Sequence, residues 1–245
     1  MLTGGSGVGK TLMFRELIQK LGRDEFVGIA TDARLAPLDG LQARVIPAWL
    51  EPGLSKESRK VRADLIWEKI RQVGTDLEVA AKSSRVKMPK VLGFDGITNL
   101  GDILQSKHII RGKSTYTNWG EYADDVLGLI GFFRGLQVKG LFRVFTCVTV
   151  PGEKDSLGRT PPELLIGTAG QLAPKHVYRF IDYHFHMDSF FDPKHEWAGP
   201  DGVVRRFQTC ELDGVASKGA PGLSTPFMRA SLWEVYRRVI LKEQS

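Results

Sequence analysis

The sequence of 245 residues suits one large domain, and its hydrophobic (42%) and charged (25%) fractions are those of an ordinary globular protein. This length excludes dependence on a disulfide or metal staple, and Cys147 and Cys210, which lack a C-x-x-C spacing, are expected to be reduced core thiols. The net charge of +6 permits binding to a polyanion without identifying one. Neither a secretory leader nor an apolar run near ~18 residues is visible, which favours a cytoplasmic protein.

The N-terminal stretch MLTGGSGVGKT contains the pattern G-x-x-x-x-G-K-[ST], which is typical of a phosphate-binding loop. Glycines let successive backbone N–H groups turn toward phosphate oxygens, and the helix that follows adds the positive end of its dipole. Lys10 is expected to reach the β- and γ-phosphates, and the Thr11 hydroxyl to bind Mg²⁺. The predicted phosphate-binding residues are Gly4, Gly5, Ser6, Gly7, Val8, Gly9, Lys10 and Thr11.

Such a loop ordinarily follows a central strand that is buried, yet only Met1, Leu2 and Thr3 precede it here. Three residues span only ~10 Å when fully extended. We therefore expect them to form a stub of that strand, in a chain whose start was truncated or assigned late.

Hydrophobic periodicity predicts alternating helices and strands in the first half of the chain. A helix is predicted at 9–22, strands at 26–33 and 43–47, and a long amphipathic helix at 56–73 with Ser55 as its N-cap. The run 90–100 is expected to be a buried strand ending in an aspartate, and the polar, basic segment 101–118 a loop. The predicted core face of the long helix consists of Val61, Leu65, Ile66 and Ile70.

The second half is predicted to hold a helix at 120–138, a strand at 140–150 and a loop at 151–162. Strand-like alternation follows from 176 to 212, with a turn at 199–202, then a loop at 214–227 and a closing helix at 229–242. This order indicates an α/β core over 1–175 with a β extension and closing helix over 176–245, in one domain.

Two polar residues end predicted strands and are candidates for the nucleotide site. Asp95 follows an apolar run, and a carboxylate at the end of a neighbouring parallel strand can hold the Mg²⁺ shell through water. An aspartate in this position is also often a turn or N-cap residue, but the phosphate loop upstream favours the metal role. Thr146 is a candidate to contact the γ-phosphate or the attacking water, or is simply a β-branched strand residue.

Together these residues resemble RecA-like P-loop ATPases, and above all phage-encoded members of the single-strand-annealing and recombination type. The corresponding stretches are GGSGVGKT, VLGFDGITNL, NWGEYADDVLGLI, VFTCVTVPGEKD and VASKGAPGL, of which the first is the specific one. The resemblance implies a mostly parallel sheet flanked by helices, with the C-terminal strands as an antiparallel extension. It further implies an oligomeric ATPase that uses ATP and Mg²⁺ and acts on DNA in phage recombination or replication, in a bacterial or phage-infected cell.

The sequence departs from that family at the groups that promote hydrolysis. Where the family carries a glutamate past its second strand, the stretch ATDARL offers Asp32 to position water, and Glu153 is the other candidate. The late loop retains Lys218 as a trans-acting candidate but lacks the arginine that would act on a neighbouring subunit's γ-phosphate. Arg159 and Arg229 are alternative sources of that arginine.

Basic and aromatic residues in the predicted loops are candidates for binding single-stranded DNA, because cations contact phosphates and aromatic rings stack on bases. A solvated surface loop is the alternative for each segment. The candidates are Lys107, Arg111, Lys113, Trp119, Lys154 and Arg159.

Three further readings remain open. His184, His186 and Asp188 share one strand face and could build a metal site, although such alternation is ordinary for a half-exposed strand. The protein could instead be an oligomeric assembly protein that binds ATP with little turnover. A small-molecule kinase is the third reading, although the 151–162 loop has only Arg159 where kinase lids carry several arginines.

Overall fold

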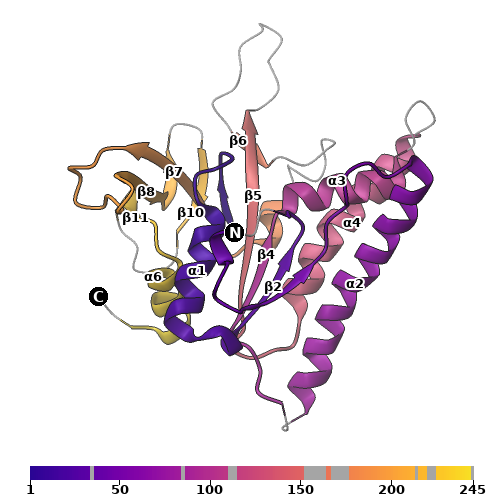
Figure 1. Ribbon diagram of the computed structural model, residues 1–245, viewed down its shortest axis with the longest axis horizontal. Helices are drawn as coiled ribbons and strands as arrows, with labels where there is room; N and C mark the ends of the chain where they lie inside the picture. Colours follow the sequence, from indigo (N-terminus) through magenta and orange to yellow (C-terminus); the bar gives the residue numbers. More distant parts are fainter. Residues whose placement is uncertain are drawn as a thin grey trace, which may run out of the picture.

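A mixed β-sheet, most of whose strands are parallel, forms the centre of the molecule (Figure 1). The computed structural model describes residues 1–33, 36–83, 86–109, 115–151, 164–166, 177–212, 215–219 and 225–243. The sheet has the strand order β11-β8-β7-β1-β5-β4-β2-β3. Strand β6 is not part of this linear order and pairs with β5 alone among the described strands. The strands are β1 (Leu2–Gly4), β2 (Phe26–Ala30), β3 (Arg44–Pro47), β4 (Val91–Asp95), β5 (Phe142–Pro151), β6 (Leu164–Ile166), β7 (Phe185–Phe191), β8 (Val203–Gln208) and β11 (Phe227–Arg229).

Strands β3, β2, β4, β5, β1 and β7 run parallel, whereas β8 and β11 continue the sheet in antiparallel pairs. A small separate hairpin, β9 (Cys210–Leu212) with β10 (Val215–Lys218), completes the C-terminal strands. Every residue of β2 and of β4 is buried, as expected for parallel strands covered on both faces. The predicted α/β class and antiparallel C-terminal extension are therefore confirmed.

Helices cover both faces of the sheet (Figure 1). On one face α2 (Lys56–Lys82), α3 (Ile97–His108) and α4 (Tyr116–Gly135) pack over alternate residues of β2 and β4. On the other face α1 (Lys10–Leu21) and α6 (Leu232–Tyr236) pack over the remaining residues. The shorter helical turns are η1 (Arg23–Glu25), η2 (Ala36–Leu38), η3 (Val177–Phe180) and η4 (Arg237–Leu241, a π-helix). No helix in the described parts of the chain has both the length and the apolarity to cross a membrane.

The loop predicted at 101–118 is wrong for most of its described residues. Helix α3 runs through His108, because Ile97, Leu100 and Leu104 recur at helical spacing and are buried in the core. Helix α4 then begins at Tyr116 behind a capping box of Thr115 with Asn118. Glycine and polar residues between the apolar positions gave this segment the composition of a loop, but the periodicity decides its structure.

The core face predicted for α2 is only half correct. Ile66 and Ile70 are buried, whereas Val61 is 62% exposed and Leu65 58% exposed. The buried stripe recurs at spacings of three and four residues from Ile66 toward the C-terminus, so Leu65 lies about 100° away from it around the helix. The buried residues of α2 are Ala63, Ile66, Trp67, Ile70, Val73, Gly74 and Leu77.

The C-terminal segment departs from its prediction at both ends. Strand β11 occupies the end of the predicted 214–227 loop and the start of the predicted 229–242 helix, which begins instead at Leu232. Both cysteines are free, but only Cys147 is buried; Cys210 is exposed, which corrects its prediction as a core thiol. Residues Leu2–Gly4 form the strand β1, which lies between β5 and β7 in the sheet.

Candidate functional site

The predicted phosphate loop connects β1 to α1, and its backbone needs glycine at two points of close approach. Gly4 has φ of 151°, and a Cβ there would overlap the carbonyl oxygen of Met187 on β7. Gly9 has φ of 101° in the left-handed region and forms the N-cap of α1 without a side-chain cap. An N-terminus without a side-chain cap leaves the first-turn N–H groups to other acceptors, as anion sites at helix N-termini do.

Lys10 folds back over this loop. Its Nζ donates hydrogen bonds to the carbonyl oxygens of Gly4 at 2.9 Å and Gly5 at 2.7 Å. This position places the Lys10 ammonium beside the loop, where it could contact a bound anion at short range.

Asp95 is the centre of the polar cluster at the carboxyl edge of the sheet. Thr11, in the first turn of α1, donates from Oγ1 to Asp95 Oδ2 at 2.8 Å. Thr146, on β5, donates from Oγ1 to Asp95 Oδ1 at 2.6 Å and accepts from the N–H of Gly96 at 2.9 Å. The cluster joins the first turn of α1 to the end of β4 and to the middle of β5, because β5 continues to Pro151 and Thr146 does not end its strand as predicted. The two side-chain groups that donate to Asp95 here are hydroxyls.

The sequence predicts that the strand carrying Asp95 lies next to the strand that precedes the loop. In the structure the two strands, β4 and β1, are not immediate neighbours. Strand β5 lies between β1 and β4, with Leu2 opposite Thr146 and Phe94 opposite Phe145. The inserted strand explains why Thr146 can bond to Asp95 while lying beside the phosphate loop.

Burial is the main influence on the pKa of Asp95. Desolvation raises the pKa of this carboxyl above its ordinary 3.8, and the negative charge of Asp32 raises it further. The hydrogen bonds from Thr146 and Thr11, and the charge of Lys10, oppose this rise without cancelling it. The ionised carboxylate is thus incompletely compensated, and a cation placed next to it would be stabilised.

A cavity of about 270 Å³ opens between the loop, the end of β4 and the middle of β5. Asp32 lies on the wall of this cavity. The preceding residue, Thr31, donates from its hydroxyl to the carbonyl oxygen of Asp95 at 3.0 Å and so holds the end of β2 against β4. Most of the predicted loop residues share the cavity with the polar cluster. The lining residues are Ser6, Gly7, Gly9, Lys10, Thr11, Leu12, Asp32, Pro37, Asp95, Gly96, Thr98, Asn99, Thr146, Cys147 and Val148.

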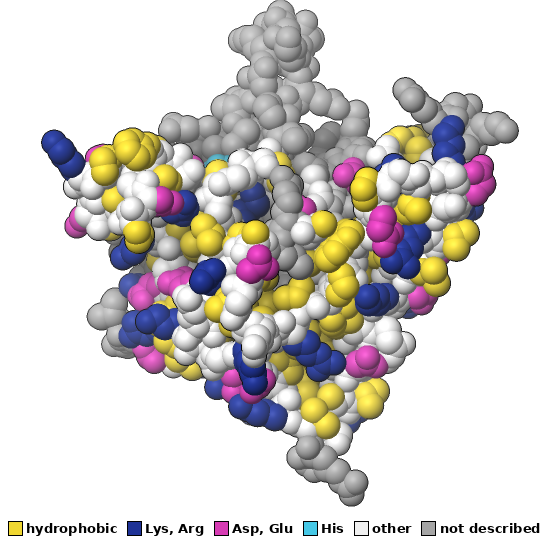
Figure 2. Space-filling model, in the orientation of Figure 1, with side chains coloured by type: hydrophobic (Ala, Val, Ile, Leu, Met, Phe, Trp, Pro, Cys, Tyr) yellow, Lys and Arg dark blue, Asp and Glu magenta, His cyan; other side chains and the backbone are white. Residues whose placement is uncertain are grey.

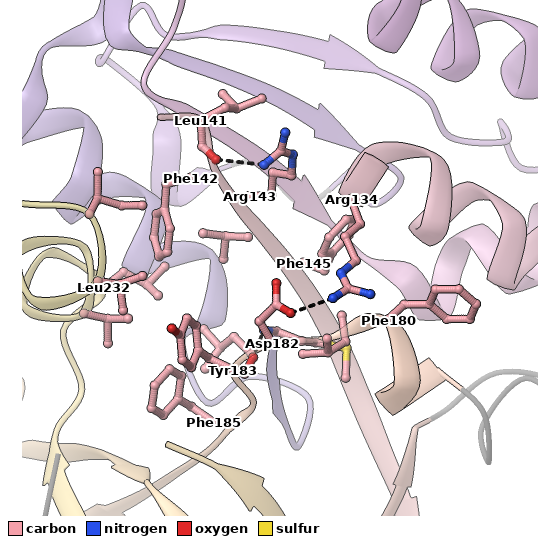
Figure 3. Close-up of a pocket in the computed structure, with 17 residues that line it drawn as sticks. Arg134, Leu141, Phe142, Arg143, Phe145, Phe180, Asp182, Tyr183, Phe185 and Leu232 are labelled. Carbon is pink, nitrogen blue, oxygen red and sulfur yellow. Dashed lines mark hydrogen bonds and ion pairs between the residues drawn. The ribbon is translucent and has the colours of Figure 1, made fainter. Parts of the chain in front are cut away.

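A second cavity, of about 310 Å³, lies near the amino ends of β1 and β5 (Figure 3). Arg134 and Asp182 form a 2.8 Å ion pair at its wall, and Arg143 donates to the carbonyl oxygen of Leu141 at 3.1 Å. The remaining lining is mainly apolar, and it includes neither the glycine loop nor the Asp95 cluster. The cavity beside the loop is therefore the better candidate for a phosphate ligand.

The described DNA-binding candidates have partners within the fold. Lys107 Nζ lies 3.0 Å from Asp125 Oδ2 and 5.0 Å from the centre of the Trp67 ring, which ties α3 to α4 and α2. Trp119 packs edge-on against Tyr122. On the face shown in Figure 2, Lys and Arg side chains are spread among acidic ones. A DNA-binding role for these residues stays a prediction.

Several predicted residues lie away from the cavity or outside the described residues. Lys218 is exposed on β10, where its backbone pairs with that of His184, and Arg229 lies on β11. Neither lines the cavity, and a role toward a neighbouring subunit stays a prediction. The candidates outside the described residues are Arg111, Lys113, Glu153, Lys154 and Arg159.

The histidines of the alternative metal reading have other partners. His184 Nε2 lies 2.7 Å from Thr3 Oγ1, and burial lowers the pKa of His184 to about 3. Asp188 bonds to Arg206 at 2.9 Å. Within the described ranges, no three His, Cys, Asp or Glu side chains are grouped so that they could hold a metal ion.

Sequence reasoning missed Arg205, a β8 residue whose side chain lies against Gly9 of the loop. The alternation of VVRRFQ indicated a strand, but nothing in it indicated that this strand lies two positions from β1. No model of a known protein family matches the chain, and no curated protein matches it either.

Proposed function

We propose that this protein binds ATP with Mg²⁺ and hydrolyses it, as a RecA-like P-loop ATPase. The observation that carries the proposal is the cluster at the carboxyl edge of the sheet, where Thr11 bonds to Asp95 in the cavity that Lys10 also lines. A cation for the phosphates and oxygen ligands for Mg²⁺ are the groups that phosphoryl transfer to water requires.

The donor set fits Mg²⁺ on chemical grounds. Thr11 and Asp95 offer a hydroxyl and a carboxylate, and Mg²⁺ prefers oxygen ligands with several waters retained. The raised pKa of Asp95 indicates a buried charge that a cation would compensate. When bound, Mg²⁺ supplies charge neutralisation on the phosphate oxygens.

The residues of the chain then act by positioning. Lys10 exchanges its two backbone acceptors for phosphate oxygens and stabilises the negative charge that develops on them. Thr146 directs its hydroxyl proton to Asp95 and so holds that carboxylate in orientation, which makes it a positioning residue. Asp32, on the cavity wall, is the described candidate to orient the attacking water and accept its proton.

Action on DNA, as a homo-oligomer, is the further part of the proposal. Its support is the resemblance to phage recombination ATPases and the net charge of +6. If several phosphates are neutralised on binding, affinity for oligonucleotides falls steeply with added salt. Salt-insensitive or undetectable binding would remove the DNA role and leave the nucleotide site intact.

ATP turnover measured with and without single- and double-stranded DNA, with mass measured in parallel, tests the proposal. We expect Lys10→Ala to lower Mg²⁺-dependent turnover by about 100-fold or more, because one preorganised donor to developing charge is lost. The matched control is Lys56→Ala, which removes a lysine at the start of α2 that does not line the cavity. Normal turnover by Lys10→Ala would contradict the site assignment.

Two other outcomes would identify the alternatives. Tight ATP binding without turnover in either condition would indicate an ATP-dependent assembly protein. Transfer of the terminal phosphate to an added small-molecule acceptor, faster than to water, would indicate a kinase.

A further inference from the structure

Arg205 of β8 approaches the phosphate loop from the side opposite to Asp95. Strand order places β8 and β7 on one side of β1, and β5 and β4 on the other. A Cβ built on Gly9 would lie 2.9 Å from Arg205 Nε and 3.3 Å from its Cδ, so the guanidinium side chain is in contact with the loop backbone. Leu12, in the first turn of α1, borders the same spot.

Asp201 holds the outer edge of this guanidinium. Arg205 Nη2 donates to Asp201 Oδ2 at 2.6 Å, and Nη1 donates to Oδ1 at 3.3 Å. Asp201 is itself fixed in the β7–β8 turn, where its Oδ1 accepts from the N–H of Val203 at 3.1 Å. A bidentate pair of this kind fixes the plane of the guanidinium, and here it leaves the Nε edge turned toward Gly9.

The Nε–H group on that edge is buried and has no hydrogen-bond partner among the described residues. A buried donor without an acceptor costs free energy, and buried polar groups are rarely left so in folded proteins. This one belongs to a permanent cation and adjoins the loop whose glycines and helix N-terminus favour an anion. A phosphate oxygen is the acceptor that would satisfy it.

We infer that Arg205 is a phosphate-binding residue of the nucleotide site, supplied by the C-terminal β extension, and that it binds the phosphates nearer the nucleoside. Lys10, Asp95 and Thr146 define the terminal-phosphate end of the cavity on the β5 side of β1. Arg205 is not itself among the residues that line the cavity, but it lies on the β7 side of β1, against Gly9 and Leu12, which do line it. The inference rests on the proposed function, and it predicts that Arg205 serves ATP and ADP alike.

Titration calorimetry of Mg²⁺-ATP and Mg²⁺-ADP tests this with two substitutions at one position. Arg205→Met keeps the length and packing of the side chain but removes its charge, and we expect it to weaken both nucleotides by about tenfold or more, by a similar factor. Arg205→Lys keeps the charge and is expected to retain part of the affinity. Thermal unfolding without nucleotide checks that each variant is folded.

Arg206→Ala is the matched control. The Arg206 side chain faces the opposite side of β8 from that of Arg205. There it pairs with Asp188 and lies 4.0 Å from the centre of the Phe227 ring. This variant removes the same charge from the same strand and is expected to bind both nucleotides as the wild type does. Equal weakening by both arginine substitutions would reduce the effect to overall charge and overturn the inference.

The outcomes separate the two proposals. If the wild type binds neither nucleotide, the proposed function fails and the Arg205 inference fails with it. If the wild type binds both and Lys10→Ala loses ATP, but Arg205→Met binds both as the wild type does, only the Arg205 inference is overturned. Loss of ATP affinity alone, with ADP unchanged, would also overturn it, because it would assign Arg205 to the terminal phosphate.

Discussion

Thr11 and Asp95, 84 positions apart in the sequence, are joined by a hydrogen bond of 2.8 Å between Thr11 Oγ1 and Asp95 Oδ2. The bond links the first turn of α1 to the end of β4 across the intervening β5. Both proposed Mg²⁺ ligands are therefore already within contact of each other, and little chain entropy has to be lost to bring them together.

Removal of the Thr11 hydroxyl is expected to weaken Mg²⁺ binding more than it lowers the stability of the fold. Thr11→Ala removes a proposed metal ligand, and we expect the Mg²⁺ concentration that half-saturates turnover to rise by about tenfold or more. Thr11→Ser keeps the hydroxyl and should stay close to wild type. Thr75→Ala, on the exposed side of α2, removes a hydroxyl that donates to the backbone carbonyl of Arg71 in the same helix, and it serves as the control. An unchanged Mg²⁺ requirement in Thr11→Ala would remove Thr11 from the metal site.

Asp95→Asn should raise stability and lower activity. The pKa of Asp95 is raised in the folded state, so the folded protein holds this proton to higher pH than the unfolded chain does. Stability is therefore lost as pH rises through the folded pKa, and at pH 7 the ionised carboxylate destabilises the nucleotide-free fold. Asparagine removes that charge and is expected to raise Tm, by about 2–4 °C for each 1 kcal/mol of stability gained.

The same Asp95→Asn variant is expected to lose most Mg²⁺-dependent turnover, since an amide is a poorer Mg²⁺ ligand than a carboxylate. Differential scanning calorimetry and a turnover assay on one preparation measure both effects. A lower Tm would show that hydrogen bonding at Asp95 outweighs its desolvation, and would contradict the charge balance described above.

Local sequence patterns predicted the parts of the site that lie on contiguous residues. The glycine loop with Lys10 and Thr11 is one such run, and Asp95 ends a short apolar run that predicts a buried strand. What they could not predict depends on strand order. The insertion of β5, which brings Thr146 to Asp95, and the position of β8, which brings Arg205 to Gly9, both follow from pairings between segments far apart in the chain.

The errors in the fold have a similar cause. The polar and basic composition of 101–118 predicts a loop, whereas the apolar residues from Ile97 recur at helical spacing and form α3. The spacing of apolar residues predicts that Val61 and Leu65 share the buried face of α2 with Ile66 and Ile70, but the position of the neighbouring helices determines which side of α2 is buried. Apolar residues in a long helix define a stripe only once its partner is known.

Acid should destabilise the protein through His184. Burial lowers the pKa of His184 to about 3, against 6.5 for the unfolded side chain. Between these values the unfolded chain binds a proton that the folded protein excludes, so stability is lost as pH falls below 6.5, by up to about 1.4 kcal/mol per pH unit. His184→Gln can keep a hydrogen bond to Thr3 without titrating, and its free energy of unfolding should change less between pH 7 and pH 5. The free energy of unfolding of both proteins can be measured with urea at each pH. An equal change between pH 7 and pH 5 in the wild type and in His184→Gln would rule out this role.

Substitutions of two loop glycines separate backbone strain from contact with Arg205. Gly7 has φ of 80° with nothing within 4 Å of an added Cβ, whereas an added Cβ on Gly9, at φ of 101°, meets Arg205 Nε at 2.9 Å. Gly7→Ala is expected to cost about 1–2 kcal/mol of stability, from the left-handed backbone alone. Gly9→Ala should cost more, because the Arg205 side chain, held by Asp201, has to move.

A double-mutant cycle isolates that contact. In the Arg205→Ala background the obstructing side chain is absent, so Gly9→Ala should cost no more there than Gly7→Ala does. The coupling between positions 9 and 205 in urea unfolding of nucleotide-free protein is then expected to reach about 0.5–3 kcal/mol, while the coupling between positions 7 and 205 stays near zero. Because this cycle needs no nucleotide, it tests the position of Arg205 against the loop independently of any ATPase activity. Additive costs at positions 9 and 205 would mean that the two residues do not touch.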